Sequence, residues 1–177
     1  MAPSSGFRSA NQLAIIKGDR SNPKWQYMLA RQERSFLQDV ERAARAFAGV
    51  SIDGGSSGLT VSGSGRDGFN MSVVVEAGRY ALYFDNWMEE VDSEQIAREL
   101  FEAALRGDAR LKVDLRGGRP WQWTLERLEN GSWRTESAVN HVTWRFWGRD
   151  STVYLRNTFP PLVLPPVDST GKALRPN

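Results

Sequence analysis

The chain has 177 residues, 40% of them hydrophobic and 25% charged, which is the composition of a soluble globular protein with one core. It has no cysteine and a single histidine, so disulfides, thiolate metal sites and metal clusters of several histidines are excluded. The formal net charge of +2 is too small to predict nucleic-acid binding, and no apolar run reaches the roughly 18–20 residues that span a bilayer.

These values lead us to expect a soluble cytoplasmic protein that has no cofactor and no metal site, and whose partner is neither a membrane nor a nucleic acid. Residues 1–11 are rich in Ser, Gly and Ala and lack the apolar core of a secretory signal, so we expect a flexible N-terminus. Residues 12–158 are predicted to form a single α+β domain. Residues 159–177 are a proline-rich tail that docks on the protein's own surface or is recognised by a partner.

A long helix is predicted to begin at Pro23, because the preceding Ser-Asn pair offers capping side chains and proline suits a first helical turn. From Phe36 to Phe47 the apolar residues recur at helical spacing, which predicts one buried face. Gly49 is a plausible end of the helix. The apolar stripe is weak near residues 31–33, where we expect that the helix could break.

Residues 51–68 hold six glycines and five serines. Two glycine-rich pieces in this stretch invite a phosphate-loop interpretation, in which backbone amides would surround an anion. The stretch lacks the Gly-Lys-Ser/Thr ending of such a loop and no long helix follows it, so hairpin turns explain the glycines better. A short strand is predicted at residues 59–62.

Residues 69–76 and 80–84 are predicted strands joined by a turn at Ala77-Gly78. We expect residues 85–91 to form an irregular acidic loop. A second helix is predicted from Ser93, which is a capping residue, to Gly107, because the apolar residues between them recur at helical spacing.

Residues 111–157 carry five of the seven tryptophans and alternate between apolar and polar residues, as strands with one buried face do. Gly117-Gly118 and Asn130-Gly131 are strong hairpin signals. Turns recur about every ten residues, which leaves no room for the crossovers of a parallel sheet. The predicted fold is therefore α+β: one curved antiparallel sheet of about six or seven strands, ending in a C-terminal meander, with two helices packed on one face.

A basic and aromatic group of residues in this meander is the leading candidate for a binding surface. Tryptophan and arginine are enriched at the centres of protein interfaces, and aromatic rings beside arginines can also stack on single-stranded bases. The motif of a common RNA-binding sheet is absent. The candidate binding residues, including one tryptophan from the acidic loop, are Trp87, Arg119, Trp121, Trp123, Arg145 and Trp147.

Candidates for catalysis are weaker. Asp85, Glu89 and Glu90 lie close together in the sequence beside Trp87, and an aromatic neighbour can raise the pKa of a carboxyl group by desolvation. Their spacing does not match a calcium loop, and a solvated acidic loop that caps the following helix explains them better. The single histidine, His141, has no nucleophile-elbow pattern near it.

We therefore expect a non-catalytic binding or interaction protein that meets a protein partner, or a second copy of itself, through the aromatic–arginine surface of the sheet. The alternative is a small-molecule-binding protein or a hydrolase-like enzyme whose carboxylate-lined site lies between the sheet and a helix. The two hypotheses differ in geometry, since the second requires that the carboxylates converge on one pocket.

Overall fold

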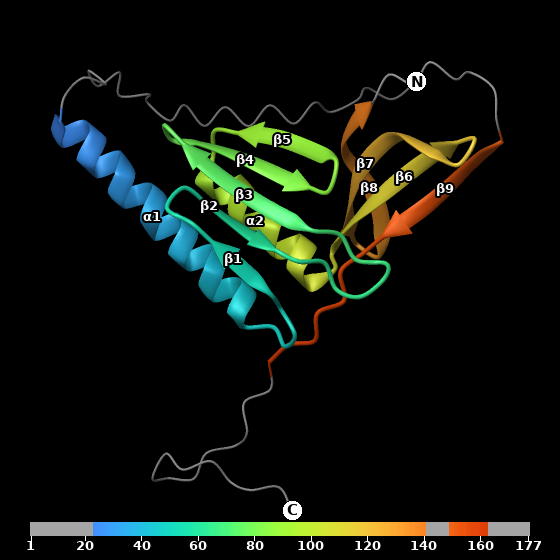
Figure 1. The fold of residues 1–177 in the computed structure, drawn as a ribbon, viewed down its shortest axis with the longest axis horizontal. Helices are drawn as coiled ribbons and strands as arrows, with labels where there is room; N and C mark the ends of the chain where they lie inside the picture. The colour runs from blue at the N-terminus through green and yellow to red at the C-terminus, as the bar shows by residue number, and fades with distance from the viewer. Residues whose placement is uncertain (1–22, 141–148, 163–177) are drawn as a thin grey trace, which may run out of the picture.

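The computed structural model describes residues 23–140 and 149–162. Figure 1 shows two helices and two antiparallel sheets, so the α+β prediction is confirmed. The prediction of one curved sheet is wrong in one respect, because the strands divide into a five-stranded sheet and a separate four-stranded sheet. The second helix connects the two sheets along the chain.

The five-stranded sheet is built from consecutive strands in the order β1-β2-β3-β4-β5. The four-stranded sheet has the order β8-β7-β6-β9. The helices are α1 (Pro23–Arg45) and α2 (Glu94–Arg106). The strands are β1 (Ile52–Gly54), β2 (Gly58–Val61), β3 (Met71–Glu76), β4 (Arg79–Phe84), β5 (Trp87–Val91), β6 (Ala109–Arg116), β7 (Arg119–Glu129), β8 (Ser132–Asn140) and β9 (Asp150–Leu155).

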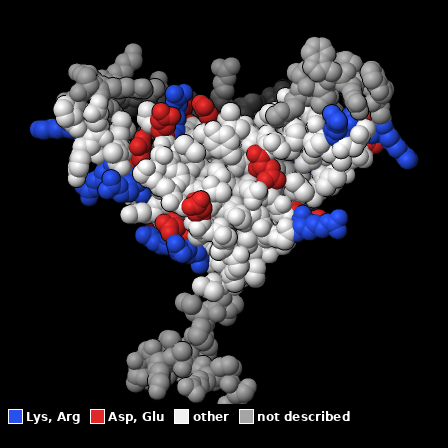
Figure 2. Space-filling view, in the orientation of Figure 1, with Lys and Arg blue, Asp and Glu red and all other residues white. Residues whose placement is uncertain are grey.

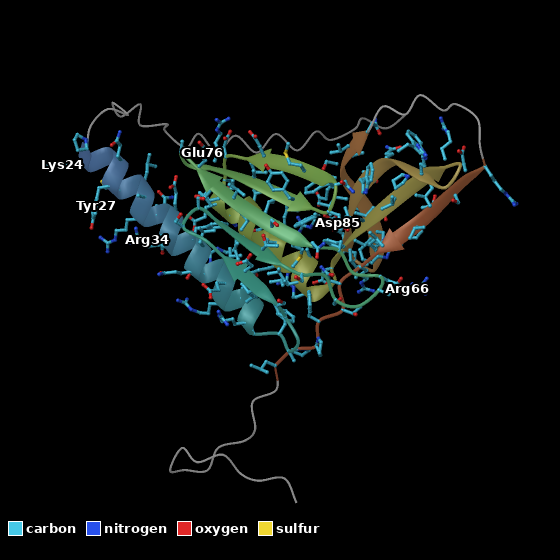
Figure 3. All side chains as sticks on the ribbon, in the orientation of Figure 1. Lys24, Tyr27, Arg34, Arg66, Glu76 and Asp85 are labelled. Carbon is cyan, nitrogen blue, oxygen red and sulfur yellow. The ribbon has the colours of Figure 1, made fainter. Side chains whose placement is uncertain are left out.

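Helix α1 runs without interruption across the stretch where a break was expected. Its C-terminal half buries Phe36, Val40 and Ala44 against the five-stranded sheet. Its N-terminal half extends beyond the sheet, and Tyr27 and Met28 are exposed there (Figure 3). Within the described residues, neither helix is both long enough and apolar enough to cross a membrane.

Helix α2 has the predicted signals at both ends. The side chain of Ser93 accepts a hydrogen bond from the Ile96 amide at 3.4 Å. Gly107 adopts a left-handed conformation (φ 76°), and the following amide of Asp108 donates to the Ala103 carbonyl at 2.7 Å. These bonds pair backbone groups that would otherwise have no hydrogen-bond partner at the helix ends.

The inner face of the five-stranded sheet is a row of apolar cross-strand partners. Val61, Met71, Phe84 and Trp87 lie opposite one another on β2 to β5, and all four are fully buried. Strand β5 corrects our expectation of an irregular loop, since only Asp85 and Asn86 form the turn. The acidic residues after Trp87 still alternate between two faces, which is a strand pattern that their charge obscured.

In the four-stranded sheet, the hairpins at Gly117-Gly118 and Asn130-Gly131 are as predicted. The sheet is not a simple meander, because β9 pairs with β6 rather than with β8. Strand β6 is therefore central, and its apolar residues Leu111 and Val113 face the core. Residues 141–148, where another strand was expected, lie outside the described part of the chain.

The buried side chain of Asn157 joins the segment after β9 to the loop between β2 and β3. Its Oδ1 accepts hydrogen bonds from the amides of Ser64 (3.2 Å) and Phe69 (3.1 Å), and its Nδ2 donates to the Phe69 carbonyl (3.1 Å). A Cβ atom on Gly68 would lie 2.4 Å from the Ser64 nitrogen, so no other residue fits there. The second glycine-rich piece is thus explained by close packing.

The first residues of the proline-rich segment lie against the end of α1. The Ala48 amide donates to the Pro160 carbonyl at 2.8 Å, and the Leu162 amide donates to the Ala46 carbonyl at 2.7 Å. Phe159 is buried in the core. Residues 159–162 therefore dock on the protein, and residues 163–177 lie outside the described part.

One half-buried charge cluster connects the two helices to β4. Arg98 of α2 contacts Asp39 of α1 at 3.0 Å and Glu94 at 2.9 Å. Burial by itself would lower the pKa of Arg98, but the hydrogen bonds to Glu94 and Asp39 and their charges raise it overall. Burial, together with the charges of Glu94 and Glu33, raises the pKa of Tyr80 to about 12.

We predict that Asn157→Ala lowers the free energy of unfolding by about 3 kcal/mol, because it leaves the buried amide and carbonyl of Phe69 and the half-buried amide of Ser64 without this partner. The measurement is urea unfolding followed by tryptophan fluorescence. Thr158→Ala is the control, since Thr158 contributes only its backbone amide to this region and should change the value by less than about 0.5 kcal/mol. Equal effects of the two variants would contradict the role assigned to Asn157.

We predict that Tyr80→Phe flattens the pH dependence of stability at high pH. The pKa of Tyr80 is raised from 10.0 to about 12, so the folded state favours the neutral phenol. The stabilisation is fully present below pH 10 and is lost as the pH rises from 10 to about 12. Urea unfolding at pH values across this window measures the slope, and Tyr27→Phe, which removes an exposed hydroxyl, is the control.

Candidate functional site: the arginine–aromatic face

The four-stranded sheet has one face turned to the core and one face turned outward. On β6, Leu111 and Val113 point inward, whereas the basic residues between and beside them point outward. Aromatic residues from the neighbouring strands lie over these basic side chains. We call this surface the arginine–aromatic face and define it by Arg110, Arg116, Trp121, Trp133, Tyr154 and Arg156.

Arg110 is the centre of this face. Its guanidinium carbon lies 4.2 Å from the ring centre of Trp133 on β8 and 4.2 Å from the ring centre of Tyr154 on β9. Its Nε donates to Glu126 of β7 at 2.7 Å. A guanidinium that contacts two rings and a carboxylate has few ways left to move. Arg110 therefore ties together side chains from all four strands of the sheet.

Two further arginines extend the pattern along the face. The guanidinium carbon of Arg156 lies 5.3 Å from the Trp133 ring centre. The guanidinium carbon of Arg116 lies 4.8 Å from the Trp121 ring centre, and its Nε donates to Asp150 at 3.1 Å. The rings are therefore held by cations on the same surface and keep fixed positions.

Carboxylates balance most of the positive charge on this face. Lys112 contacts Asp114 at 3.2 Å, and Thr152 donates a hydrogen bond to the same carboxylate at 2.6 Å. Apolar surface remains between these pairs, because Tyr154 is 47% exposed and Leu128, the cross-strand partner of Trp133, is 36% exposed. The face thus combines rigid aromatic rings with paired charges.

The structure separates the predicted binding residues into three groups. Trp121 and Arg119 lie at the start of β7, where a bulge opposite Leu115 leaves Trp121 half-buried on the outer face. Trp87 and Trp123 are core residues, with exposed fractions of 0% and 6%. Their rings are therefore not available to a partner at the surface. Arg145 and Trp147 lie outside the described residues.

Sequence analysis missed Arg110, Trp133 and Tyr154. A signal was present for Arg110, because it alternates with the apolar residues of β6 and has the same phase as Lys112, which predicts that its side chain points outward. No sequence signal identifies the partners, since the three residues lie on β6, β8 and β9 and meet only through the strand order.

The catalytic candidates do not converge. Asp85 forms the β4–β5 turn (Figure 3) and accepts a hydrogen bond from the Asn70 amide at 3.0 Å. Glu89 accepts from Ser137 at 2.6 Å, and Ser137 in turn accepts from the Trp87 Nε1 at 3.2 Å. Glu90 points to the other face of β5, where it contacts Arg79 at 3.5 Å. These three carboxylates therefore have separate structural partners.

His141 lies outside the described residues. Within residues 23–140 and 149–162, no group of three or more histidine, aspartate or glutamate side chains is arranged to hold a metal ion. Asp85, Glu89 and Glu90 therefore do not line a common pocket in this part of the chain.

We predict that Arg110→Ala lowers the free energy of unfolding by about 2 kcal/mol, because two cation–π contacts and a charge-assisted hydrogen bond are lost together. Arg110→Lys keeps the charge but not the planar contact, and should give an intermediate loss. Arg134→Ala is the matched control on the same sheet, since its contact with Glu129 is exposed and should be worth less than about 0.5 kcal/mol. Urea unfolding checks all three, and equal losses would contradict the central position of Arg110.

The arrangement of this face has to be interpreted from its own geometry. In comparisons with known proteins, the chain matches no family model, no curated protein and no solved structure.

Proposed function

We propose that this chain is a non-catalytic interaction protein that binds a protein partner through the arginine–aromatic face. The observation that carries the proposal is the position of Arg110 between Trp133 and Tyr154 on a sheet surface that is turned away from the core. Interfaces draw most of their binding energy from a few tryptophan, tyrosine and arginine residues that are already fixed in place. Rigid side chains of this kind lose little conformational entropy when they bind.

The charge pattern supports a protein partner over a nucleic acid. Arg110, Arg116 and Lys112 each contact a carboxylate on the same face. A nucleic-acid backbone would have to compete with these carboxylates for the three cations, and it would bring its own negative charge close to them. A protein surface with polar and aromatic groups has no such cost, and a second copy of the chain is one such surface.

We predict that Tyr154→Ala and Trp121→Ala weaken association at least tenfold, because each removes aromatic area from the proposed interface without opening the core. Sedimentation velocity over a range of protein concentrations measures self-association. Tyr83→Ala is the matched control, since Tyr83 is a tyrosine of similar exposure on the other sheet.

If the wild-type protein stays monomeric, affinity capture with the wild type and the same three variants as bait replaces sedimentation. A partner retained by wild type and Tyr83→Ala, but lost by Tyr154→Ala, supports the proposal. Partners or self-association that all variants retain equally would contradict it. Circular dichroism of each variant shows whether it has kept its fold.

A further inference from the structure

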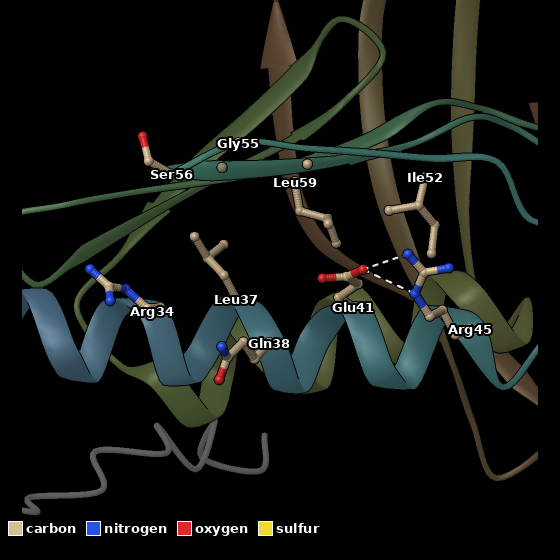
Figure 4. A pocket seen from close by; sticks show the side chains of 11 residues that line it. Arg34, Leu37, Gln38, Glu41, Arg45, Ile52, Gly55, Ser56 and Leu59 are labelled. Atoms are coloured by element: carbon tan, nitrogen blue, oxygen red, sulfur yellow. Dashed lines mark hydrogen bonds and ion pairs between the residues drawn. The ribbon is translucent and has the colours of Figure 1, made fainter.

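A groove runs between helix α1 and the free edge of the five-stranded sheet (Figure 4). It encloses about 530 Å³ and is lined on one side by α1 and on the other by β1, β2 and the turn that joins them. Leu37 and Leu59 give it an apolar floor, and Arg34 and Arg45 lie toward its two ends. Both walls therefore consist of described residues.

The sheet wall of this groove has unpaired backbone groups. Strand β1 is the edge of the sheet and pairs only with β2 in the described structure. The Ser51 carbonyl accepts from Ser62 at 3.0 Å, and the Gly55 amide donates to Gly58 at 2.8 Å, so residues 51 and 55 bond toward β2. Since bonding direction alternates along an antiparallel strand, the amides and carbonyls of Ile52 and Gly54 point away from β2.

The residues along this edge leave the backbone accessible. Gly54, Gly55 and Ser56 are exposed and carry small side chains or none. The only acid on β1, Asp53, is the cross-strand partner of Thr60, and both residues are exposed on the opposite face of the sheet. Free edges of this kind accept an extended peptide as an additional strand, in which alternate side chains face the groove. Helix α1 runs beside β1 (Figure 1) and would flank such a strand.

The charges in the groove favour a peptide with an acidic side chain. Arg45 is neutralised by Glu41, with contacts of 2.6 Å and 2.9 Å. Arg34 has no ion pair or hydrogen bond with any residue in the described part of the chain, and its side chain is exposed. The groove therefore offers one uncompensated cation at the Arg34 end and an apolar floor beside it.

We propose that this groove binds an extended segment of a partner protein as an additional strand on β1, and that the alternate positions of this segment that face the groove carry an acidic residue followed by apolar residues. An acidic side chain would pair with Arg34, and an apolar side chain would cover Leu37 and Leu59. The site shares no residue with the arginine–aromatic face, so the two proposals are independent.

Charge also argues against occupants from the chain itself. Residues 1–22 contain three basic residues and one acid, and residues 163–177 contain two basic residues and one acid. Both segments would add positive charge beside Arg34. A second copy paired edge to edge would bring its own Arg34 and Arg45 to the same place. An external acidic segment is the occupant that complements the groove.

The test uses a fluorescein-labelled peptide of about six residues, the Glu-Val peptide, in which one Glu and two Val residues occupy alternate positions with Ser between them, because a strand of this length covers β1 completely and presents Glu and Val on the same face. Fluorescence anisotropy with the full-length protein measures its affinity, and the matching Lys-Val peptide is the charge control. We expect the Glu-Val peptide to bind at least roughly tenfold more tightly than the Lys-Val peptide. Equal affinities, or no binding of the Glu-Val peptide, would overturn the proposal.

Two variants address the two halves of the site. Arg34→Glu should lower the affinity for the Glu-Val peptide by roughly tenfold or more, because it reverses the charge that pairs with the peptide's acidic side chain. Arg42→Glu makes the same change in net charge on the same helix but outside the groove, and should leave the affinity nearly unchanged. Gly54→Pro removes an amide that the fold does not use, and should weaken binding similarly. Equal effects of Arg34→Glu and Arg42→Glu would contradict a specific site.

Hydrogen exchange of the wild-type protein gives a readout that requires no variant. The amides of Ile52 and Gly54 should exchange rapidly in the free protein and become protected when the Glu-Val peptide is added. Binding without this protection would overturn strand addition. Protection that instead rises with protein concentration in the absence of peptide would show edge-to-edge pairing of two copies and overturn the external partner. The Tyr154→Ala variant should bind the peptide with wild-type affinity. A failure of the groove proposal can therefore be distinguished from a failure of the proposed arginine–aromatic interface.

Discussion

The arrangement of the two sheets depends on the buried amide side chain of Asn157. This one side chain is both acceptor and donor for the loop between β2 and β3, and it comes directly after the strand that completes the other sheet. Its neighbour Arg156 donates to the Gly107 carbonyl at the end of α2 at 2.6 Å and through its backbone to the Asp67 carbonyl at 2.7 Å. Three parts of the fold meet at two consecutive residues.

This junction also explains the glycines around it. Gly68 lies too close to Ser64 for any side chain, and a Cβ atom on Gly107 would lie 2.5 Å from the Asn157 carbonyl oxygen. A sequence feature that resembles an anion-binding loop is therefore a packing requirement. A second connection, from Trp87 and Glu89 of β5 to Ser137 of β8, joins the two sheets directly. The orientation of the arginine–aromatic face relative to the five-stranded sheet therefore depends on two separate sets of hydrogen bonds.

The two candidate surfaces differ in their physical character. On the arginine–aromatic face, Arg110, Lys112 and Arg116 are already paired with carboxylates, so binding there would rely mainly on aromatic area and fixed geometry. In the groove beside β1, backbone groups and one cation are open, so binding there would rely on hydrogen bonds and charge. Figure 2 shows that the face of the molecule viewed there, over the five-stranded sheet, is mostly uncharged, with basic side chains near its margins. We therefore expect the two proposed surfaces to bind partners of different chemical character.

Local signals in the sequence predicted the features that depend on neighbouring residues. Ser93 and Gly107 define α2, and the glycine pairs define the hairpins, because caps and turns require particular residues within a few positions. The division into two sheets could not be predicted, since it depends on Asn157 contacting residues about ninety positions earlier. The contacts of Arg110 with Trp133 and Tyr154 could not be predicted either, because they depend on a strand order that places β9 beside β6. Trp87 and Trp123 were included among the binding candidates because composition does not show which way a ring points.

The pairing of β9 with β6 has a consequence for how the protein is made. A ribosome releases both helices and the whole five-stranded sheet before it releases β9 and Asn157. Until then, β6 has an open edge and the loop after β2 has no anchor, so the nascent chain presents an incomplete sheet to its surroundings. Closure of the four-stranded sheet therefore comes after the rest of the described fold has been released, and the period before it is when chaperones have the most unpaired strand edge to recognise.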